Sequence, residues 1–489
     1  MLKDFLKELF KHSSIYSIGL ILTSFLSIIL LPVYTKYLTP SDYGILSLCD
    51  LFKSFSVLIV MCGIQSAFTR YYHYYDDNRK RLCIYNTALI FSLCVDILLF
   101  LITFSFSSVI SYYLLGTYKY KDYIRIISFV FLFLGIKNIN LAYFATNKQS
   151  ILRTIFQVLI SYLGAFLTLL MLIYYHFGIK SFLYSDLIVS ILVVIISLYI
   201  LFQKVNFRLI SFSYLKSMLQ YGIPLVPALI FANFMHNIDQ YLLRLFKGLN
   251  IVGIYAIAYK FPFMLNNLFL VSLNTIWGTA LIYDIAKNKN SDYIFSRIAT
   301  YCMLVYIYGM FCLSVMSPII VKLLVAKEYL SAYKYIPIIC LGLVPYAFHS
   351  FLSVGVKIKL ETWYIPITFF VGCLSNLILN YFLIPKYGAI GASWSTFFSY
   401  SIFAIVSYIL YSRSYKITFE WNRLSKLLII AILLYLVSEF LDIKYFIIRL
   451  IIKIFICISF PIILYISNFF TNTEKIYITN FIFKVKRNQ

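Results

Sequence analysis

Runs of about 20 apolar residues recur along the whole chain, separated by short polar segments. As a helix that rises 1.5 Å per residue, such a run is long enough to cross a hydrocarbon core of about 30 Å. Membrane segments must be helical, because lipid offers no hydrogen bonds to the backbone. The pattern predicts fourteen spans, at residues 14–34, 44–68, 84–106, 123–145, 155–175, 181–201, 223–245, 251–273, 298–316, 336–356, 365–384, 389–410, 427–441 and 447–466.

Composition also indicates an integral membrane protein. Apolar residues make up 62% of the chain and charged residues only 12%, which is too little polar surface for a water-soluble fold of 489 residues. Residues 1–11 are amphipathic and basic and run into a full-length apolar segment without an Ala-x-Ala site, so we expect an uncleaved first helix. Because no loop is long enough for a soluble domain, the functional residues are expected among the helices.

The basic residues that give the chain its net charge of +24 lie mainly in the loops. In a soluble protein, such a net charge would indicate a nucleic-acid partner. Here, 25 of the 42 Lys and Arg residues fall in one alternate set of loops and 13 in the other. The positive-inside rule makes the richer set cytoplasmic, and an even number of spans puts both termini on that side. The basic residues are therefore explained by topology, and no nucleic-acid partner is expected.

Two segments about 210 residues apart share one pattern. Gly44 begins a span that carries Lys53 nine residues on, and Gly253 begins a span that carries Lys260 seven residues on. At the same offset, residues 176–184 before span six resemble residues 386–394 before span twelve, and residues 147–149 resemble 357–359. Six spans per repeat is an even number, so the repeats are parallel, related by an axis along the membrane normal.

This repeat predicts the domain organisation. We expect a six-helix lobe at residues 1–205, a second at 206–412, and two further spans with a basic cytoplasmic tail at 413–489. The linker at 207–221 mixes basic and apolar residues and is expected to lie on the cytoplasmic surface as an amphipathic segment.

Several short motifs carry a resemblance to a known family. They are Lys-Tyr-Leu-Thr-Pro-Ser-Asp-Tyr-Gly at 36–44, Arg70-Tyr-Tyr, Gly-Ile-Tyr-Ala-Ile-Ala at 253–258 and Tyr-Gly-Ala-Ile-Gly-Ala-Ser-Trp at 387–394. With the 6+6+2 layout, they resemble bacterial polysaccharide-exporting flippases of the Wzx type, in the superfamily that includes MATE drug exporters and lipid II flippases. Lipid II flippases carry arginines on the first helix, whereas residues 14–34 have no charge. This difference argues against the lipid II branch.

The resemblance implies an all-α, MATE-like, alternating-access protein of the bacterial cytoplasmic membrane. Its substrate would be an undecaprenyl-diphosphate-linked oligosaccharide, moved from the inner to the outer leaflet for O-antigen, capsule or exopolysaccharide synthesis. Membrane lipids, a polysaccharide polymerase and a chain-length regulator would be its partners. A MATE-like exporter of cations or drugs stays open as the alternative.

Two lysines are the first candidates for binding the diphosphate. A charge inside a membrane costs about 2.5–3.5 kcal/mol even on the lenient insertion scale, so it usually faces a cavity or a partner. Lysine offers phosphate a compact point charge. Lys53 has Asp50 one turn earlier on the same face, which could simply neutralise it, whereas Lys260 has no acidic residue within one turn. Lys260 is therefore the stronger candidate.

Span seven carries a polar stripe. Its members fall on one helical face, at Asn233, His236, Asn237, Gln240 and Arg244. Amide side chains both donate and accept hydrogen bonds, as sugar hydroxyls require. The stripe predicts either a sugar-binding wall or hydrogen bonding between the lobes, and Arg244 could serve only as an interfacial anchor.

Acidic residues within or beside the spans are candidates for ion coupling, namely Asp239, Asp96 and Asp50. The sequence contains no Gly-Lys-Ser/Thr phosphate loop, His-Glu-x-x-His or Gly-x-Ser-x-Gly motif, so we expect a transporter and not an enzyme. The nine scattered cysteines predict neither a disulfide framework nor a metal site. No cofactor is expected, and energy would come from a proton or sodium gradient, the membrane potential or consumption of the product.

Overall fold

The structure is a computed structural model that describes residues 19–476, except 148, 207, 278–281, 283, 284, 289, 360, 362, 442–444 and 473. For residues 271, 272 and 274–277 it describes the backbone alone. The predicted amphipathic segment 1–11, the first residues of span one and the tail beyond 476 lie outside the described residues. All regular secondary structure in the described part is helical, which confirms the predicted all-α fold class.

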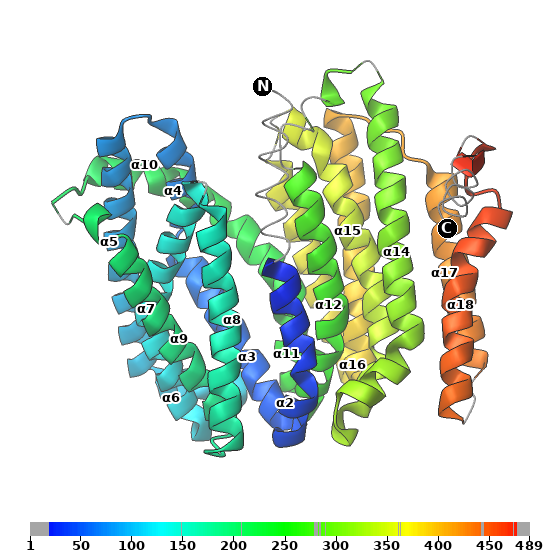
Figure 1. The fold of residues 1–489 in the computed structure, drawn as a ribbon, viewed down its shortest axis with the longest axis horizontal. Coiled ribbons are helices and arrows are strands. Elements are labelled where there is room, and N and C mark those ends of the chain that lie inside the picture. Colours follow the sequence, from blue (N-terminus) through cyan, green and yellow to red (C-terminus); the bar gives the residue numbers. More distant parts are fainter. Residues whose placement is uncertain are drawn as a thin grey trace, which may run out of the picture.

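The N-terminal half forms one bundle (Figure 1). Its first span, Gly19–Tyr37, ends in α2 (Leu31–Tyr37). The remaining helices are α3 (Pro40–Val60), α4 (Ile64–Tyr74), α5 (Asn78–Ser105), α6 (Ser107–Leu115), η1 (Tyr118–Tyr120), α7 (Lys121–Thr146), α8 (Ser150–Ile173), α9 (Ile179–Ile200) and η2 (Phe202–Lys204).

After the linker helix α10 (Phe212–Gly222), which lies with α4 and α5 in the first bundle, the second half forms another bundle beside it, shown from green to red in Figure 1. Its helices are η3 (Ile223–Leu225), α11 (Val226–Lys247), α12 (Leu249–Trp277), α14 (Ser291–Leu324), η4 (Lys327–Lys334), α15 (Ile336–Ile358), α16 (Tyr364–Ser414), α17 (Trp421–Phe440) and α18 (Phe446–Ile466).

Eleven described helical segments are long and apolar enough to cross a membrane, so the predicted number of fourteen is not reached by this measure. One reason is α16, which contains both spans eleven and twelve. Gly388 interrupts it with φ 59° and ψ −134°, and Ser399 Oγ then accepts from Asn376 Nδ2 at 3.0 Å. The chain therefore turns back at Gly388, and α16 is a hairpin of two helices.

Predicted span two is broken. Its first part is α3 and its second part is α4, separated by Met61–Gly63, where Cys62 and Gly63 have φ of 49° and 67°. A Cβ on Gly63 would lie 2.5 Å from Gly222 O, at the end of α10. The break is thus in close contact with the linker helix α10, which packs on α4 and α5 as an amphipathic segment.

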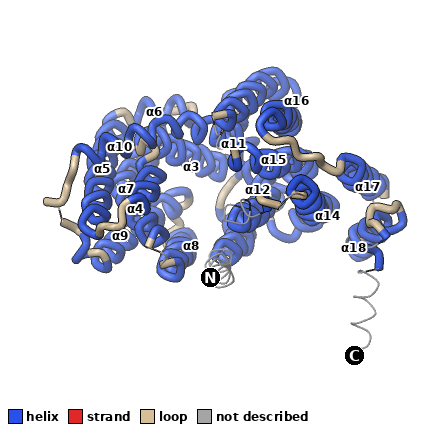
Figure 2. Tube along the Cα trace, turned by 90° about the horizontal axis from the view of Figure 1, so that it is seen from above, coloured by secondary structure: helices blue, strands red, loops and turns tan. Residues whose placement is uncertain are grey.

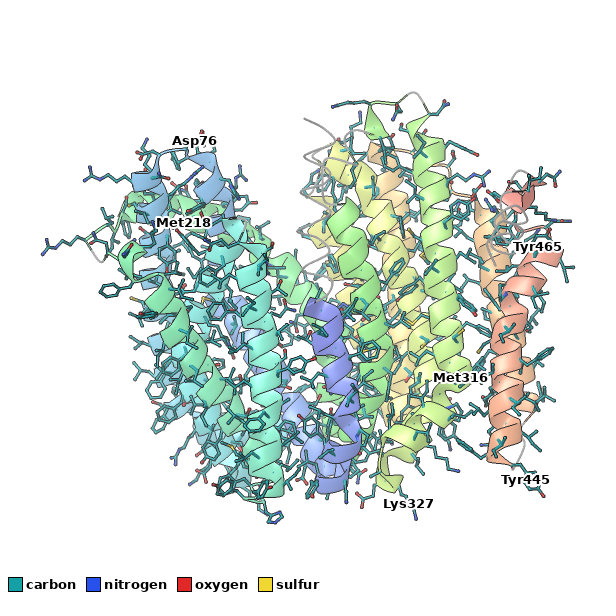
Figure 3. All side chains as sticks on the ribbon, viewed as in Figure 1. Asp76, Met218, Met316, Lys327, Tyr445 and Tyr465 are labelled. Atoms are coloured by element: carbon teal, nitrogen blue, oxygen red, sulfur yellow. The ribbon has the colours of Figure 1, made fainter. Side chains whose placement is uncertain are left out.

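The two bundles meet mainly through α3, which packs more extensively against α12 and α11 than against helices of its own half. Figure 2 shows α3, α11 and α12 at the centre of the molecule and α17 and α18 at one edge. In Figure 3, Asp76 lies at one end of the bundles and Lys327 and Tyr445 lie at the opposite end. This arrangement follows the predicted alternation of loops.

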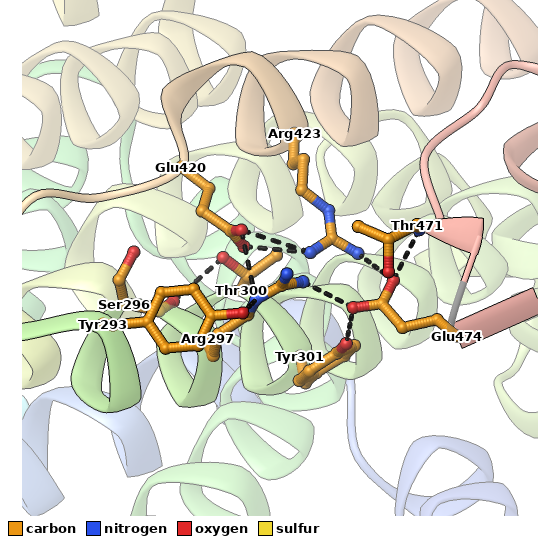
Figure 4. Close-up of polar contacts among 9 residues, drawn as sticks. All are labelled: Tyr293, Ser296, Arg297, Thr300, Tyr301, Glu420, Arg423, Thr471 and Glu474. Carbon is orange, nitrogen blue, oxygen red and sulfur yellow. Dashed lines mark hydrogen bonds and ion pairs between the residues drawn. The ribbon is translucent and has the colours of Figure 1, made fainter. Parts of the chain in front are cut away.

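Helices α17 and α18 are attached to α14 by polar contacts at two levels. Within the apolar region, the buried Lys453 donates hydrogen bonds to Val315 O at 2.9 Å and Ser438 Oγ at 3.2 Å. Near one end, Glu474 pairs with Arg297 of α14 and with Arg423 of α17 (Figure 4).

Candidate functional site

The bundles touch most closely at the two glycines of the repeat. A Cβ on Gly253 would lie 1.8 Å from Pro40 O, and a Cβ on Gly44 would lie 2.2 Å from Leu249 O. Only glycine therefore permits α3 and α12 to approach so closely. We call the end of the molecule that carries these glycines the Gly44 end; the charge pattern of the sequence predicts that it faces outward.

Hydrogen bonds between the bundles reinforce this closure. Ser47 of α3 donates to Gln240 Oε1 of α11. Arg244 donates to Tyr112 O of α6 at 2.8 Å. Tyr329 Oη donates to Leu38 O at 2.9 Å. Two members of the predicted polar stripe, Gln240 and Arg244, therefore join the bundles in this state.

Lys53 lies between two carboxylates. Its Nζ is 2.8 Å from Asp50 Oδ1 and 2.7 Å from Asp186 Oδ2 of α9. The Lys53 side chain is 19% exposed, whereas Asp50 is 72% exposed and Asp186 35%. The predicted contact with Asp50 is present, and Asp186 neutralises Lys53 further from the opposite side.

Lys260 has a different environment. Its Nζ donates to Tyr43 Oη of α3 at 3.2 Å and lies 6.0 Å from the centre of the Tyr43 ring. Among the described residues, no carboxylate lies within ion-pair distance of Lys260. Together with Asp186, it lines a cavity of about 290 Å³ between the first span, α8 and α9. An accessible cation therefore lies at the boundary between the bundles.

The rest of the polar stripe is divided between two environments. His236 Nδ1 lies 2.6 Å from Tyr400 Oη and 3.4 Å from Tyr259 Oη, so it points into the second bundle. Asn237 Nδ2 donates to Asn233 Oδ1 at 3.0 Å, and both amides are half-buried. The predicted face does exist, but its residues do not converge on one site.

The candidate ion-coupling carboxylates Asp239 and Asp96 are buried and do not lie together. Asp239 accepts from Tyr255 Oη of α12, with Thr396 Oγ1 at 3.5 Å. Asp96 accepts from the backbone N–H groups of Gly135 and Ile136 at 2.9–3.1 Å. Asp50, the third candidate, is exposed beside Lys53.

Some polar residues were missed by the sequence reasoning. Asp186 is an acidic residue inside predicted span six. A charge inside the membrane is costly, and the criterion that identified Lys53 would also have identified Asp186. Asn380 donates to Asn376 Oδ1 at 2.9 Å inside the second bundle. In the part of the chain that the structure describes, no group of three or more His, Cys, Asp or Glu is arranged to hold a metal ion.

Two helical bundles meet around α3, α11 and α12, with Lys53, Asp186 and Lys260 near their boundary. A family model for polysaccharide biosynthesis proteins matches residues 33–334, more than half of the chain. The chain therefore belongs to this family of polysaccharide biosynthesis proteins, in agreement with the resemblance carried by its motifs.

Solved structures share the fold. The lipid II flippase MurJ in an inward closed conformation superposes with a TM-score of 0.75 at 19% identity, covering 94% of this chain and 99% of MurJ. An inward-facing MATE-family multidrug transporter gives 0.66 at 16% identity, over 84% and 95%. A transporter of the same superfamily from Pyrococcus furiosus gives 0.60 at 16% identity, over 86% and 96%.

One curated relative also matches. The uncharacterized membrane protein MJ1068 of Methanocaldococcus jannaschii is 24% identical over 286 residues, which is 56% of this chain. The match spans about half of that relative's length, 55%.

Proposed function

We propose that the protein is a flippase that moves undecaprenyl-diphosphate-linked oligosaccharides from the inner to the outer leaflet of the bacterial cytoplasmic membrane. The product would serve O-antigen, capsule or exopolysaccharide synthesis. Membership of the polysaccharide biosynthesis family and the MurJ-like fold support this proposal. MurJ is itself described as a lipid II flippase.

The observation that carries the proposal is the position of Lys260. Its ammonium group borders a cavity at the boundary of the bundles, with a tyrosine hydroxyl as its hydrogen-bond partner. A cation in such a place is costly unless it meets an anion during the working cycle. The diphosphate of a lipid-linked sugar supplies that anion, and charge-assisted hydrogen bonds to phosphate oxygens are among the strong ones.

Lys53 would act later than Lys260. Because Asp50 and Asp186 already neutralise it, a diphosphate must displace a carboxylate before it can bind there. Lys260 therefore makes the first contact in the proposal, and Lys53 joins once the pairing at Asp186 or Asp50 loosens.

Transport would proceed by alternating access. In this state the Gly44 end is closed by the contacts of α3 with α11 and α12, so the substrate would enter from the opposite side. A proton or sodium gradient would drive the return, with Asp239 as the coupling carboxylate because it is buried with two hydroxyl neighbours that can also serve an ion.

Replacement of Lys260 tests the proposal. In a producing strain that lacks its own copy, Lys260→Ala should abolish surface polysaccharide while membrane insertion stays normal, and Lys260→Arg should retain part of it. The control is Lys36→Ala, which removes an exposed lysine near the Gly44 end. This variant should export polysaccharide normally. Normal export by Lys260→Ala would refute the assigned role. Drug resistance conferred by the chain with unaltered surface glycan would favour the MATE-like exporter.

A further inference from the structure

The cavity that Lys260 borders is lined by polar groups from several helices. Thr23 and Ser27 come from the first span, Ser161 from α8, Ser185 and Asp186 from α9, and Lys260 from α12. Its volume of about 290 Å³ lies just below the range of about 300–1,000 Å³ that ligand sites occupy. It therefore has room for a fragment of a lipid-linked oligosaccharide and not for the whole molecule.

Six hydroxyl groups line this cavity, and four of them share one hydrogen-bonding state. Each of these four uses its single hydrogen on a backbone carbonyl, in the pairs Thr23–Leu20 at 3.1 Å, Ser27–Ser24 at 2.8 Å, Ser161–Gln157 at 3.1 Å and Ser185–Gly164 at 2.7 Å. A hydroxyl whose hydrogen is engaged offers only its lone pairs. The Asp186 carboxylate is likewise an acceptor. These acceptors therefore favour a ligand that brings hydrogen-bond donors, whereas Lys260 favours an anionic group beside them.

An apolar occupant suits this cavity poorly. A prenyl or acyl chain would cover the Lys260 ammonium group and the free lone pairs of Asp186 without bonding them, and a buried polar group left unsatisfied costs about 1–3 kcal/mol. A second cavity shows the contrast. It lies between α14, α15, α16 and α17 and has a volume of about 350 Å³. Its lining is mostly apolar, with side chains such as Met303, Ile307 and Leu341.

We propose that the cavity between the first span, α8 and α9 is the subsite for the sugar next to the diphosphate. The sugar hydroxyls donate to Asp186 and to the hydroxyls of Ser27 and Ser161, while Lys260 marks the phosphate side. This assignment rests on the proposed function and adds to it a place for the sugar. It also makes α8 and α9, and not only α11, the elements that select the glycan.

Filling the cavity tests the assignment. Ser161→Trp introduces bulk from α8, Ser27→Phe does so from the opposite wall, and Thr23→Val removes an acceptor at nearly constant volume. Phe166→Trp is the matched control, because Phe166 lies on the same helix and is 59% exposed. Each variant is measured for surface polysaccharide in the producing strain. The purified full-length chain is measured for binding of undecaprenyl diphosphate without sugar.

The expected result is a loss of export with the diphosphate site intact. The filling variants should lower surface polysaccharide at least about tenfold, equivalent to about 1.4 kcal/mol, while the Kd for undecaprenyl diphosphate stays within about twofold. Thr23→Val should lower export several-fold, and Phe166→Trp should change neither quantity. Normal export by Ser161→Trp or Ser27→Phe, or an equal loss of undecaprenyl diphosphate binding, would overturn the sugar assignment. Failure of the unaltered chain to restore surface polysaccharide would instead refute the proposed function.

Discussion

Gly178 and Gly388 lie 210 residues apart and have nearly the same backbone conformation, with φ 55° and ψ −128° at the first and φ 59° and ψ −134° at the second. Gly178 joins α8 to α9, and Gly388 joins the two halves of α16. The repeat seen in the sequence is thus a repeat of backbone geometry, with one glycine turning each helical hairpin.

Gly388→Ala should destabilise the protein. An L side chain rarely adopts a positive φ of this kind, and the cost is about 1–3 kcal/mol. Thermal unfolding in detergent should show a lower Tm for Gly388→Ala and for Gly178→Ala. The control is Gly164→Ala within α8, where the new Cβ would lie 3.8 Å from Ser185 Oγ, an ordinary contact. Helix propensity favours alanine there by about 1 kcal/mol, so an unchanged or higher Tm is expected. Equal Tm values for all three variants would contradict this account.

Gly253→Val should prevent closure at the Gly44 end. Because even a Cβ at this position would lie 1.8 Å from Pro40 O, the two helices must separate. In a variant without native cysteines, a short bifunctional thiol reagent should cross-link Ser47→Cys to Gln240→Cys efficiently, since the native side chains at these positions are hydrogen-bonded to each other. The yield should fall sharply when Gly253→Val is added, and export should stop. An unchanged yield would show that closure of the two bundles does not depend on this contact. The control substitution is Gly309→Val, on α14.

The Lys53–Asp186 pair should show energetic coupling. Lys53→Met leaves the Asp186 carboxylate partly buried without its 2.7 Å partner, and Asp186→Leu leaves Lys53 with Asp50 alone. Each change should lower stability, and the double variant should recover part of the loss, with a coupling free energy of about 1–3 kcal/mol. A double-mutant cycle on the free energy of unfolding measures it. Export should remain low in the double variant if Lys53 also binds the diphosphate, whereas recovered export would assign Lys53 a structural role alone.

The sequence predicts the helical fold and the repeat because both follow from apolar periodicity and from glycines at a fixed offset. It does not predict what each polar residue of α11 contacts. Gln240, Arg244 and His236 share a helical face, yet Gln240 bonds α3, Arg244 bonds α6 and His236 bonds α16. These partners depend on how the bundles are placed against each other, which local patterns do not encode. The break at Met61–Gly63 was missed for a similar reason, since apolar residues continue through it.

The cluster of Glu474, Arg297 and Arg423 should make the attachment of α17 and α18 sensitive to acid. Burial alone would raise the pKa of Glu474. Hydrogen bonds from Tyr301 Oη and Thr471 N–H, with the charges of Arg423 and Arg297, outweigh it and hold this pKa below its ordinary value. A lowered pKa adds stability that is fully present above the ordinary glutamate pKa of about 4.3 and is lost as the pH falls through the lowered value.

Glu474→Gln should therefore lower the free energy of unfolding at pH 7 by about 1.5–3 kcal/mol, as expected for hydrogen bonds to a charged group. The difference from the unaltered protein should shrink as the pH falls below about 4.3, because protonation of Glu474 then favours the unfolded state. Thermal unfolding at a series of pH values measures this difference. Glu328→Gln, at an exposed position in η4, should behave like the unaltered protein throughout. A deficit for Glu474→Gln that stays constant with pH would show that Glu474 acts by packing and not by its charge.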